Sequence, residues 1–166
     1  MRFRTAAASA TLALAGCAPL AHDAAPPPAA DFVLVDKSDR MLTLYARGTA
    51  VKTYRGLQFG AAPQGHKRFE RDERTPEGRY AIDARNPASA YRLSLRVSYP
   101  NAADRAWAAA RGRSPGGDIF LHGQLNWLPA GRMPGDWTDG CIALANAEIE
   151  ELWRAVPDGT PIEIRP

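Results

Sequence analysis

Cys141 is the residue of this sequence whose type and position point most directly to covalent chemistry. It follows the polar turn Thr138–Gly140 and precedes the apolar residues Ile142 and Leu144, so we expect it where a loop meets a strand. A thiolate is a strong nucleophile, provided that a base lies within hydrogen-bonding reach. The alternative is a buried free cysteine that packs as a small apolar residue.

His122 is the candidate base. It follows the run Asp118–Leu121 and would lie at the end of a strand, and Gly123 after it would let a backbone or a substrate approach closely. His122 and Cys141 are 19 positions apart, and the loop 124–135 between them is rich in glycine and proline and can bring the pair together. The alternative is a strand-edge histidine that is hydrogen-bonded to the backbone.

A metal site is a competing chemistry for the same residues. Its candidate ligands would be His66, Asp72, His122 and Cys141. None of them has the close spacing of zinc motifs such as CxxC or HExxH. We therefore expect no metal and no other cofactor.

Short apolar runs predict the strands that would position this pair. The runs lie at 32–35, 41–45, 51–54, 79–83, 91–97, 119–121 and 162–164, and the polar residues 36–40 predict a hairpin turn. Two segments have helical patterns, 102–111 and 146–156, the second with Asn146 as its N-cap and Glu148 in its first turn. This pattern predicts a mainly β, sandwich-like or barrel-like domain with two short peripheral helices.

The first 16 residues have the pattern of a secretory signal peptide. Arg2 and Arg4 precede an apolar stretch that ends at Cys17 and is too short to span a membrane. The segment 14–17 resembles the lipobox of bacterial lipoproteins, in which cleavage precedes the cysteine and the cysteine carries the lipid. An ordinary signal peptide that contains a cysteine is the alternative.

The lipoprotein interpretation predicts three segments: a signal peptide at 1–16, a lipidated Cys17 with an Ala/Pro-rich tether at 17–30, and a catalytic domain at 31–166. Acyl chains on Cys17 would anchor the domain at a membrane surface without a spanning helix. Cys141 would then have no disulfide partner in a compartment that oxidises thiols.

The charge balance argues against nucleic acid as a partner. The chain has 166 residues and a net charge of +3 with a pI near 9.1. Without Arg2 and Arg4, 19 basic residues face 18 acidic ones. This leaves no electrostatic field of the kind that nucleic-acid-binding domains carry.

An ordered set of motifs resembles the YkuD-type L,D-transpeptidase family over nearly all of residues 31–166. The motifs are Gly60, Gly65–Lys67, Thr75–Tyr80, Ser98–Asn101, Ile119–Gly123 and Trp137–Leu144. The resemblance implies a β-sandwich-like catalytic fold and a cysteine that attacks peptidoglycan stem peptides in the cell envelope. It also implies that Cys141 is the nucleophile and His122 its base.

Two positions depart from the commonest family signature. Asp139 stands where the family usually has His, and Ala143 stands where it often has Arg or Asn. These features resemble a divergent, YafK-like branch, in which hydrolysis of the bond between peptidoglycan and an outer-membrane lipoprotein is also known. Three hypotheses follow: an L,D-transpeptidase, a hydrolase of that linkage, and a non-catalytic wall-binding lipoprotein.

The proposed mechanism assigns roles to further residues. A nearby imidazolium is expected to lower the pKa of Cys141 from its free value of about 8.5, and the backbone N–H groups of Gly140 and Cys141 are candidate oxyanion donors. The segment Thr75–Gly78 fits a type I turn. Candidate substrate-binding residues are His66, Gly123, Trp137, Thr138 and Asp139.

These hypotheses predict the location and the partners. We expect an envelope protein of the periplasm, anchored by lipid at Cys17, in the outer membrane if the host is Gram-negative. Its partners would be peptidoglycan stem peptides and an outer-membrane lipoprotein, with no nucleic acid.

Overall fold

A computed structural model of the chain describes residues 27–128 and 130–166. The signal peptide expected at 1–16 and the lipidation expected at Cys17 lie outside the described residues. Ala30, at the end of the expected tether, is already buried, and its N–H donates to the carbonyl of Ala155. Within the described residues, no helix is long and apolar enough to cross a membrane.

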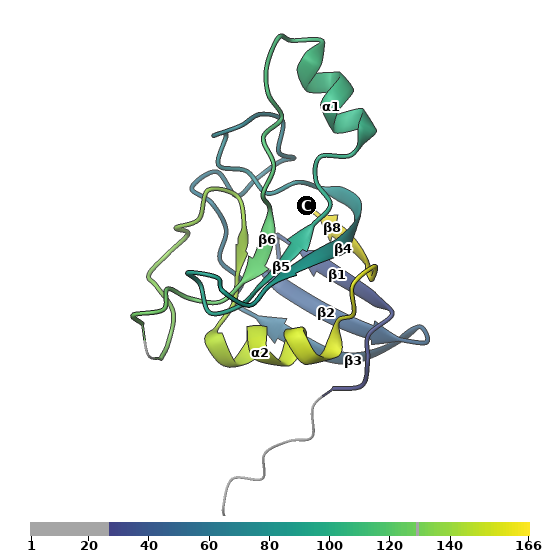
Figure 1. The fold of residues 1–166 in the computed structure, drawn as a ribbon, viewed down its shortest axis with the longest axis vertical. Helices are drawn as coiled ribbons and strands as arrows, with labels where there is room; N and C mark the ends of the chain where they lie inside the picture. Colours follow the sequence, from purple (N-terminus) through teal and green to yellow (C-terminus); the bar gives the residue numbers. More distant parts are fainter. Residues whose placement is uncertain (1–26, 129) are drawn as a thin grey trace, which may run out of the picture.

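The strands of the described residues form one curled eight-stranded sheet in the order β3-β2-β1-β8-β4-β5-β6-β7 (Figure 1). This confirms the mainly β fold that the sequence predicts. The strands are β1 Phe32–Asp36, β2 Met41–Ala46, β3 Thr49–Arg55, β4 Gly78–Asn86, β5 Ser94–Val97, β6 Phe120–His122, β7 Ile142–Ala143 and β8 Pro161–Arg165.

The half of the sheet built by β1, β2, β3 and β8 is the scaffold. β1 and β2 form the expected antiparallel hairpin, with Val33 opposite Leu44 and Val35 opposite Leu42. These four side chains are fully buried, because alternate residues of a strand face the same side of the sheet. β8 pairs in parallel with β1, so the end of the chain lies beside its first strand.

β4 connects this scaffold to the half that holds the candidate pair. It pairs with β8 and with β5, and its register shifts between Ile82 and Ala84. β6 pairs antiparallel with β5, and β7 pairs in parallel with β6, with His122 opposite Ala143. Strands far apart in the sequence therefore bring residues 122 and 143 together.

Two helices flank the sheet at opposite ends of the molecule (Figure 1). In α1, Ala102–Ala109, the Asn101 side chain caps the helix by accepting from the N–H groups of Ala103 and Asp104. In α2, Asn146–Ala155, the buried residues Ile149, Leu152 and Ala155 pack into the core.

The sequence-based prediction of the α2 N-cap was wrong. The N-cap is Ala145, whose N–H donates to the Glu148 carboxylate, so the expected role of Glu148 in the first turn is confirmed. Asn146 is already helical. Its side chain instead accepts from the N–H of Gln124 and donates to the carbonyl of Leu128, so it holds the loop after β6.

Two further local predictions were wrong. The strand expected from residue 91 begins at Ser94, since Arg92 has a φ of 67°, which a strand cannot accommodate. The segment Thr75–Gly78 makes no type I turn and runs extended into β4. Thr75 is instead buried, and its hydroxyl contacts the turn before Cys141.

Candidate active site

Cys141 lies at the entrance to β7, immediately after a tightly held turn. The Thr138 hydroxyl donates to the carbonyl of Cys141 at 2.8 Å, and the Thr75 hydroxyl donates to the carbonyl of Gly140 at 2.9 Å. Gly140 has a φ of 116°, and a Cβ there would lie 2.4 Å from the backbone oxygen of Arg74. Glycine is therefore required at 140 for both conformation and space.

His122 is buried in β6, and one of its ring nitrogens is committed. Nδ1 lies 2.6 Å from the carbonyl oxygen of Gly123. Because a carbonyl can only accept, Nδ1 carries the proton, and in the neutral ring the lone pair is on Nε2. The ring packs against Tyr91 and Trp137, with centroid distances of 4.7 and 5.6 Å. The imidazole is thus held in one tautomer with a basic nitrogen available.

The pairing of β7 with β6 brings Cys141, which directly precedes β7, close to the strand that holds His122. His122 is opposite Ala143, and Cys141 precedes Ala143 by two residues. Among the described residues, the thiol donates one hydrogen bond, to the carbonyl oxygen of Asp118 at 3.4 Å. The thiol of the predicted nucleophile therefore contacts the segment that leads into β6, the strand that ends at the predicted base.

The pKa values differ from those that the sequence predicts. Burial raises the pKa of the Cys141 thiol to about 11, and the negative charges of Asp139 and Asp118 add to this rise. Burial also lowers the pKa of His122 to about 4. The expected imidazolium that lowers the thiol pKa is absent from this arrangement, because burial disfavours the charged form of the imidazole. Near neutral pH the pair consists of a thiol and a neutral imidazole.

The two candidate oxyanion donors are not equivalent. The N–H of Gly140 already donates to the Thr138 hydroxyl at 3.3 Å. The N–H of Cys141 is therefore the stronger local candidate for a developing oxyanion.

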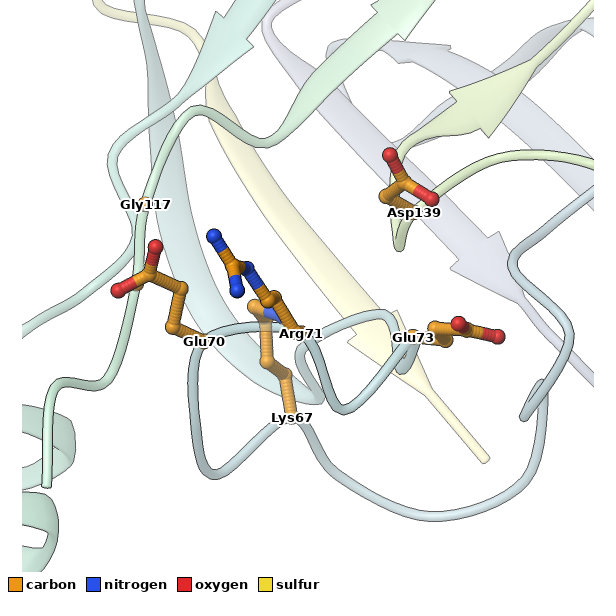
Figure 2. A pocket seen from close by; sticks show the side chains of 7 residues that line it. Lys67, Glu70, Arg71, Glu73, Gly117 and Asp139 are labelled. Carbon is orange, nitrogen blue, oxygen red and sulfur yellow. The ribbon is translucent and has the colours of Figure 1, made fainter.

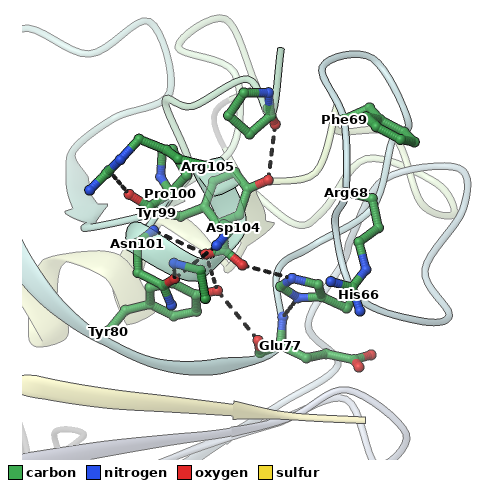
Figure 3. A network of polar contacts seen from close by, with 12 residues as sticks. His66, Arg68, Phe69, Glu77, Tyr80, Tyr99, Pro100, Asn101, Asp104 and Arg105 are labelled. Atoms are coloured by element: carbon green, nitrogen blue, oxygen red, sulfur yellow. Dashed lines mark hydrogen bonds and ion pairs between the residues drawn. The ribbon is translucent and has the colours of Figure 1, made fainter. Parts of the chain in front are cut away.

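His66 does not lie with the pair. It belongs to a buried polar network beside α1 (Figure 3), where Nε2 lies 3.0 Å from Asp104 Oδ1 and Nδ1 accepts from the N–H of Glu77 at 2.8 Å. Asp104 also accepts from the Tyr80 hydroxyl at 3.0 Å. Both ring nitrogens are used for structure, so the geometry gives no support to the predicted role of His66 in substrate binding.

Gly123 and Thr138 are placed as structural residues. A Cβ at Gly123 would lie 2.6 Å from the side-chain oxygen of Asn146 and 2.9 Å from Ile149, so this glycine allows α2 to approach β6 rather than a substrate. Thr138 is buried and holds the turn before Cys141. Neither residue presents a free group to a ligand in this arrangement.

Trp137 and Asp139 remain beside the candidate pair. Trp137 is half-buried; its ring contacts His122, and its indole N–H donates to Gln58 at 3.3 Å. Asp139 is exposed, and its charge acts on Cys141. These two are the predicted binding residues whose positions agree best with contact to a substrate.

Several contributing residues were missed at the sequence level. Tyr91 stacks on His122, although in the sequence it reads as part of a strand. Gln58 and Gln124 are buried and hydrogen-bonded to each other at 3.1 Å, and they tie the loop after β6 to the sheet. A glutamine between Leu57 and Phe59 was the one available signal, because a buried polar side chain needs a partner.

A polar cavity of about 370 Å³ opens next to the turn before Cys141 (Figure 2). It is lined by Lys67, Glu70, Arg71, Glu73, Gly116, Gly117 and Asp139. Over the described residues, no three His, Cys, Asp or Glu side chains are grouped so that they could hold a metal ion. The four candidate ligands named from the sequence do not lie together, since His66 belongs to the network beside α1.

The family model of the YkuD L,D-transpeptidase catalytic domain matches residues 30–164. The chain therefore belongs to this family, as its motifs predict. The chain has no match among curated proteins.

Solved structures agree with this assignment. The helical cell shape determining protein Pgp2 from Campylobacter jejuni, as its K307A mutant, is 28% identical, with a TM-score of 0.65 over 82% of this chain and 47% of that one. Bd1075 from Bdellovibrio bacteriovorus is 27% identical, with a TM-score of 0.58 over 82% of this chain and 48% of that one. This chain spans about half the length of these two proteins.

An L,D-transpeptidase from Mycobacterium smegmatis shares the fold. It is 15% identical, with a TM-score of 0.53 over 82% of this chain and 59% of that one.

Proposed function

We propose that this chain is a cysteine acyltransferase that performs L,D-transpeptidation on peptidoglycan stem peptides. The observation that carries the proposal is the pairing of β7, which Cys141 directly precedes, with β6, which holds His122. The Nδ1 of His122 is fixed by the Gly123 carbonyl, so that Nε2 is left as a base. Membership of the L,D-transpeptidase family supports the substrate class.

The reaction begins from a neutral pair. As the sulfur attacks the carbonyl between diaminopimelate and the following D-alanine, the thiol proton passes to His122 Nε2. The oxyanion that forms is stabilised by the Cys141 N–H. The imidazolium then protonates the leaving nitrogen, D-alanine departs, and a thioester joins the peptide to Cys141. Because the proton moves together with the attack, the high thiol pKa does not prevent the reaction.

The second half-reaction determines the product. An acceptor amine loses its proton to His122 and attacks the thioester, and collapse of the intermediate returns the proton to the sulfur. Water in place of the amine would give hydrolysis. The buried Ala143, opposite His122, offers no charge to hold an acceptor or donor carboxylate at that position.

We further propose an envelope location, with the domain tethered through a lipidated Cys17. The support is the sequence pattern of residues 1–17 and a substrate class that exists in the envelope. Metabolic labelling with a clickable palmitate analogue tests it: the wild-type chain should be labelled and Cys17→Ser should not. A wild-type chain without label would contradict the lipid anchor.

Product analysis tests the reaction. The full-length chain, purified in detergent, is incubated with tetrapeptide muropeptides, with and without an attached lipoprotein, and the products are identified by mass spectrometry. We expect a diaminopimelate cross-link that requires Cys141 and His122 and is retained by the control variant His66→Gln.

Other outcomes would reassign the protein. Cys141-dependent release of D-alanine or lipoprotein without a cross-link would identify a hydrolase. Absence of any Cys141-dependent product would refute both enzyme proposals and favour a wall-binding module.

A further inference from the structure

The cavity beside the Cys141 turn shares its walls with the candidate nucleophile. Gly117 lines the cavity, and the next residue, Asp118, provides the carbonyl that accepts the Cys141 thiol. Asp139 lines it from the other side, two residues before Cys141. A group bound in this cavity would therefore lie next to the reacting atom.

The third wall is the loop 67–74, which is rigidly built. The buried Lys67 ammonium contacts Asp72 at 2.9 Å, and the same carboxylate accepts from the backbone N–H groups of Arg68, Phe69 and Arg74. The backbone oxygen of Arg74 then packs against Gly140. The Asp72 carboxylate thus holds the loop together, and the loop packs against the turn before Cys141.

The cavity is lined by one guanidinium and three carboxylates that have no partner among the described residues. Within residues 27–128 and 130–166, no hydrogen bond or ion pair is made by the side chains of Arg71 and of the three carboxylates that line the cavity, Glu70, Glu73 and Asp139. Arg71 and Asp139 are exposed, and Figure 2 shows the Arg71 guanidinium between Glu70 and Asp139. Lys67 differs, because its charge is already matched by Asp72.

A cavity in which one unpaired guanidinium lies among unpaired carboxylates suits a ligand that carries both charges. Arginine binds carboxylates through two parallel N–H donors, and a carboxylate accepts from an ammonium. A free amino-acid head group, with ammonium and carboxylate on one carbon, meets both requirements. A purely anionic ligand would be repelled by Glu70, Glu73 and Asp139.

We propose that this cavity is the subsite for the zwitterionic head group at the far end of the diaminopimelate side chain, with Arg71 binding its carboxylate and Asp139 its ammonium. The inference rests on the proposed function, in which the scissile carbonyl belongs to the other end of the same residue. A short methylene chain joins the two ends, so the head group would enter the cavity while the carbonyl reaches Cys141. Arg71 thereby supplies the cation that Ala143 lacks.

Binding of three stem tetrapeptides distinguishes the contribution of Arg71 from that of Asp139. Their third residue is diaminopimelate, lysine, which keeps the ammonium but lacks the carboxylate, or 2-aminopimelate, which keeps the carboxylate but lacks the ammonium. Calorimetry measures their affinity for the full-length Cys141→Ala chain, in which no turnover occurs, and for the same chain with Arg71→Gln, Asp139→Asn or Arg74→Gln.

We expect the effect of each substitution to follow the charge it removes. Arg71→Gln should lower the affinity for the diaminopimelate and aminopimelate peptides roughly 10- to 100-fold, as the loss of a charge-assisted hydrogen bond predicts. Its affinity for the lysine peptide should stay within twofold. Asp139→Asn should lower the affinity for the diaminopimelate and lysine peptides and leave the affinity for the aminopimelate peptide unchanged. Arg74→Gln, the same charge change in the same loop but outside the cavity lining, should alter none of them.

The inference is overturned if Arg71→Gln weakens all three peptides equally or none of them, or if the diaminopimelate peptide binds no more tightly than the lysine peptide. Turnover by the Cys141 chain is measured in parallel. Selective binding without a Cys141-dependent product would contradict the proposed function and leave the subsite standing, whereas turnover without selectivity would do the reverse.

Discussion

The two histidines of the described domain show opposite uses of the same side chain. His66 has both ring nitrogens engaged, one with Asp104 and one with the N–H of Glu77. His122 has Nδ1 engaged with the Gly123 carbonyl, while its ring faces rest on Tyr91 and Trp137. The first arrangement joins segments, and the second fixes a tautomer and leaves a lone pair available.

The difference teaches how to separate a structural histidine from a candidate base without reference to sequence motifs. A carbonyl partner on Nδ1 defines where the proton is and presents a base at Nε2. A backbone N–H on Nδ1 and a carboxylate on Nε2 leave no lone pair for chemistry. By this criterion His122 is the candidate base, and His66 connects the loop before β4 to α1.

The largest expected effect is a difference in activity between variants at His122 and at His66. His122→Gln should lower the rate of acyl-enzyme formation by about 10²- to 10⁴-fold, the usual contribution of a general base. His66→Gln should keep the rate per folded molecule within about threefold of the wild type. Intact-protein mass spectrometry of the thioester measures both. Equal losses in the two variants would remove the distinction drawn here.

Because His122 is buried, the free energy of unfolding should fall at acid pH. The pKa of about 4 in the folded state lies below the value of 6.5 for the free side chain, so between these values the unfolded chain binds the proton more readily. Stability is therefore complete above pH 6.5 and falls as the pH approaches 4, by about 3 kcal/mol for this residue.

The control for the acid effect is His122→Phe, which keeps a ring between Tyr91 and Trp137 but cannot titrate. Urea unfolding of both chains at pH 7.5 and pH 4 gives the comparison. The wild type should lose more stability than the variant over this interval. Parallel losses in the two chains would show that His122 does not carry the acid sensitivity.

Removal of His66 should cost stability rather than catalysis. His66→Leu leaves the N–H of Glu77 without its acceptor and removes one donor from the buried Asp104 carboxylate. We expect a loss of about 1–3 kcal/mol, seen as a lower urea midpoint with an unchanged slope. An unchanged midpoint would mean that water replaces the imidazole at no cost.

The smallest effect concerns the resting thiol. Because burial raises the pKa of Cys141 to about 11, alkylation by iodoacetamide at pH 7.5 should be about tenfold slower than that of a free cysteine. The rate should rise steadily with pH towards 11, in the wild type and in His122→Gln alike. A plateau below pH 8 would reveal a preformed thiolate–imidazolium pair instead.

Much of the fold was readable because its signals are local. The hairpin of β1 and β2 follows from short apolar runs around a polar turn. The segment of α1 is rich in alanine, and α2 carries a clear periodic pattern. The errors arose where tertiary contacts override local preference. Asn146 serves the loop after β6 instead of capping α2, and the positive φ of Arg92 delays the start of β5.

The candidate pair was also readable, since Cys141 and His122 stand in motifs of the family. Their environment was not. Tyr91, Gln58 and Gln124 reach the site from separate parts of the chain, and the partners of a buried polar side chain depend on which strands meet. The cavity that holds Arg71 likewise needs three segments, the loop 67–74, Gly116–Gly117 and Asp139.

The sequence by itself therefore determined the family and the mainly β architecture, and it supplied the candidate nucleophile and base, because these depend on residue type and short-range pattern. The tertiary structure alone decided the protonation of the pair and the different hydrogen-bond partners of His66 and His122. Protonation depends on burial and on the charges that folding places nearby, and these distances exist only once β6, β7 and the loop 67–74 have come together.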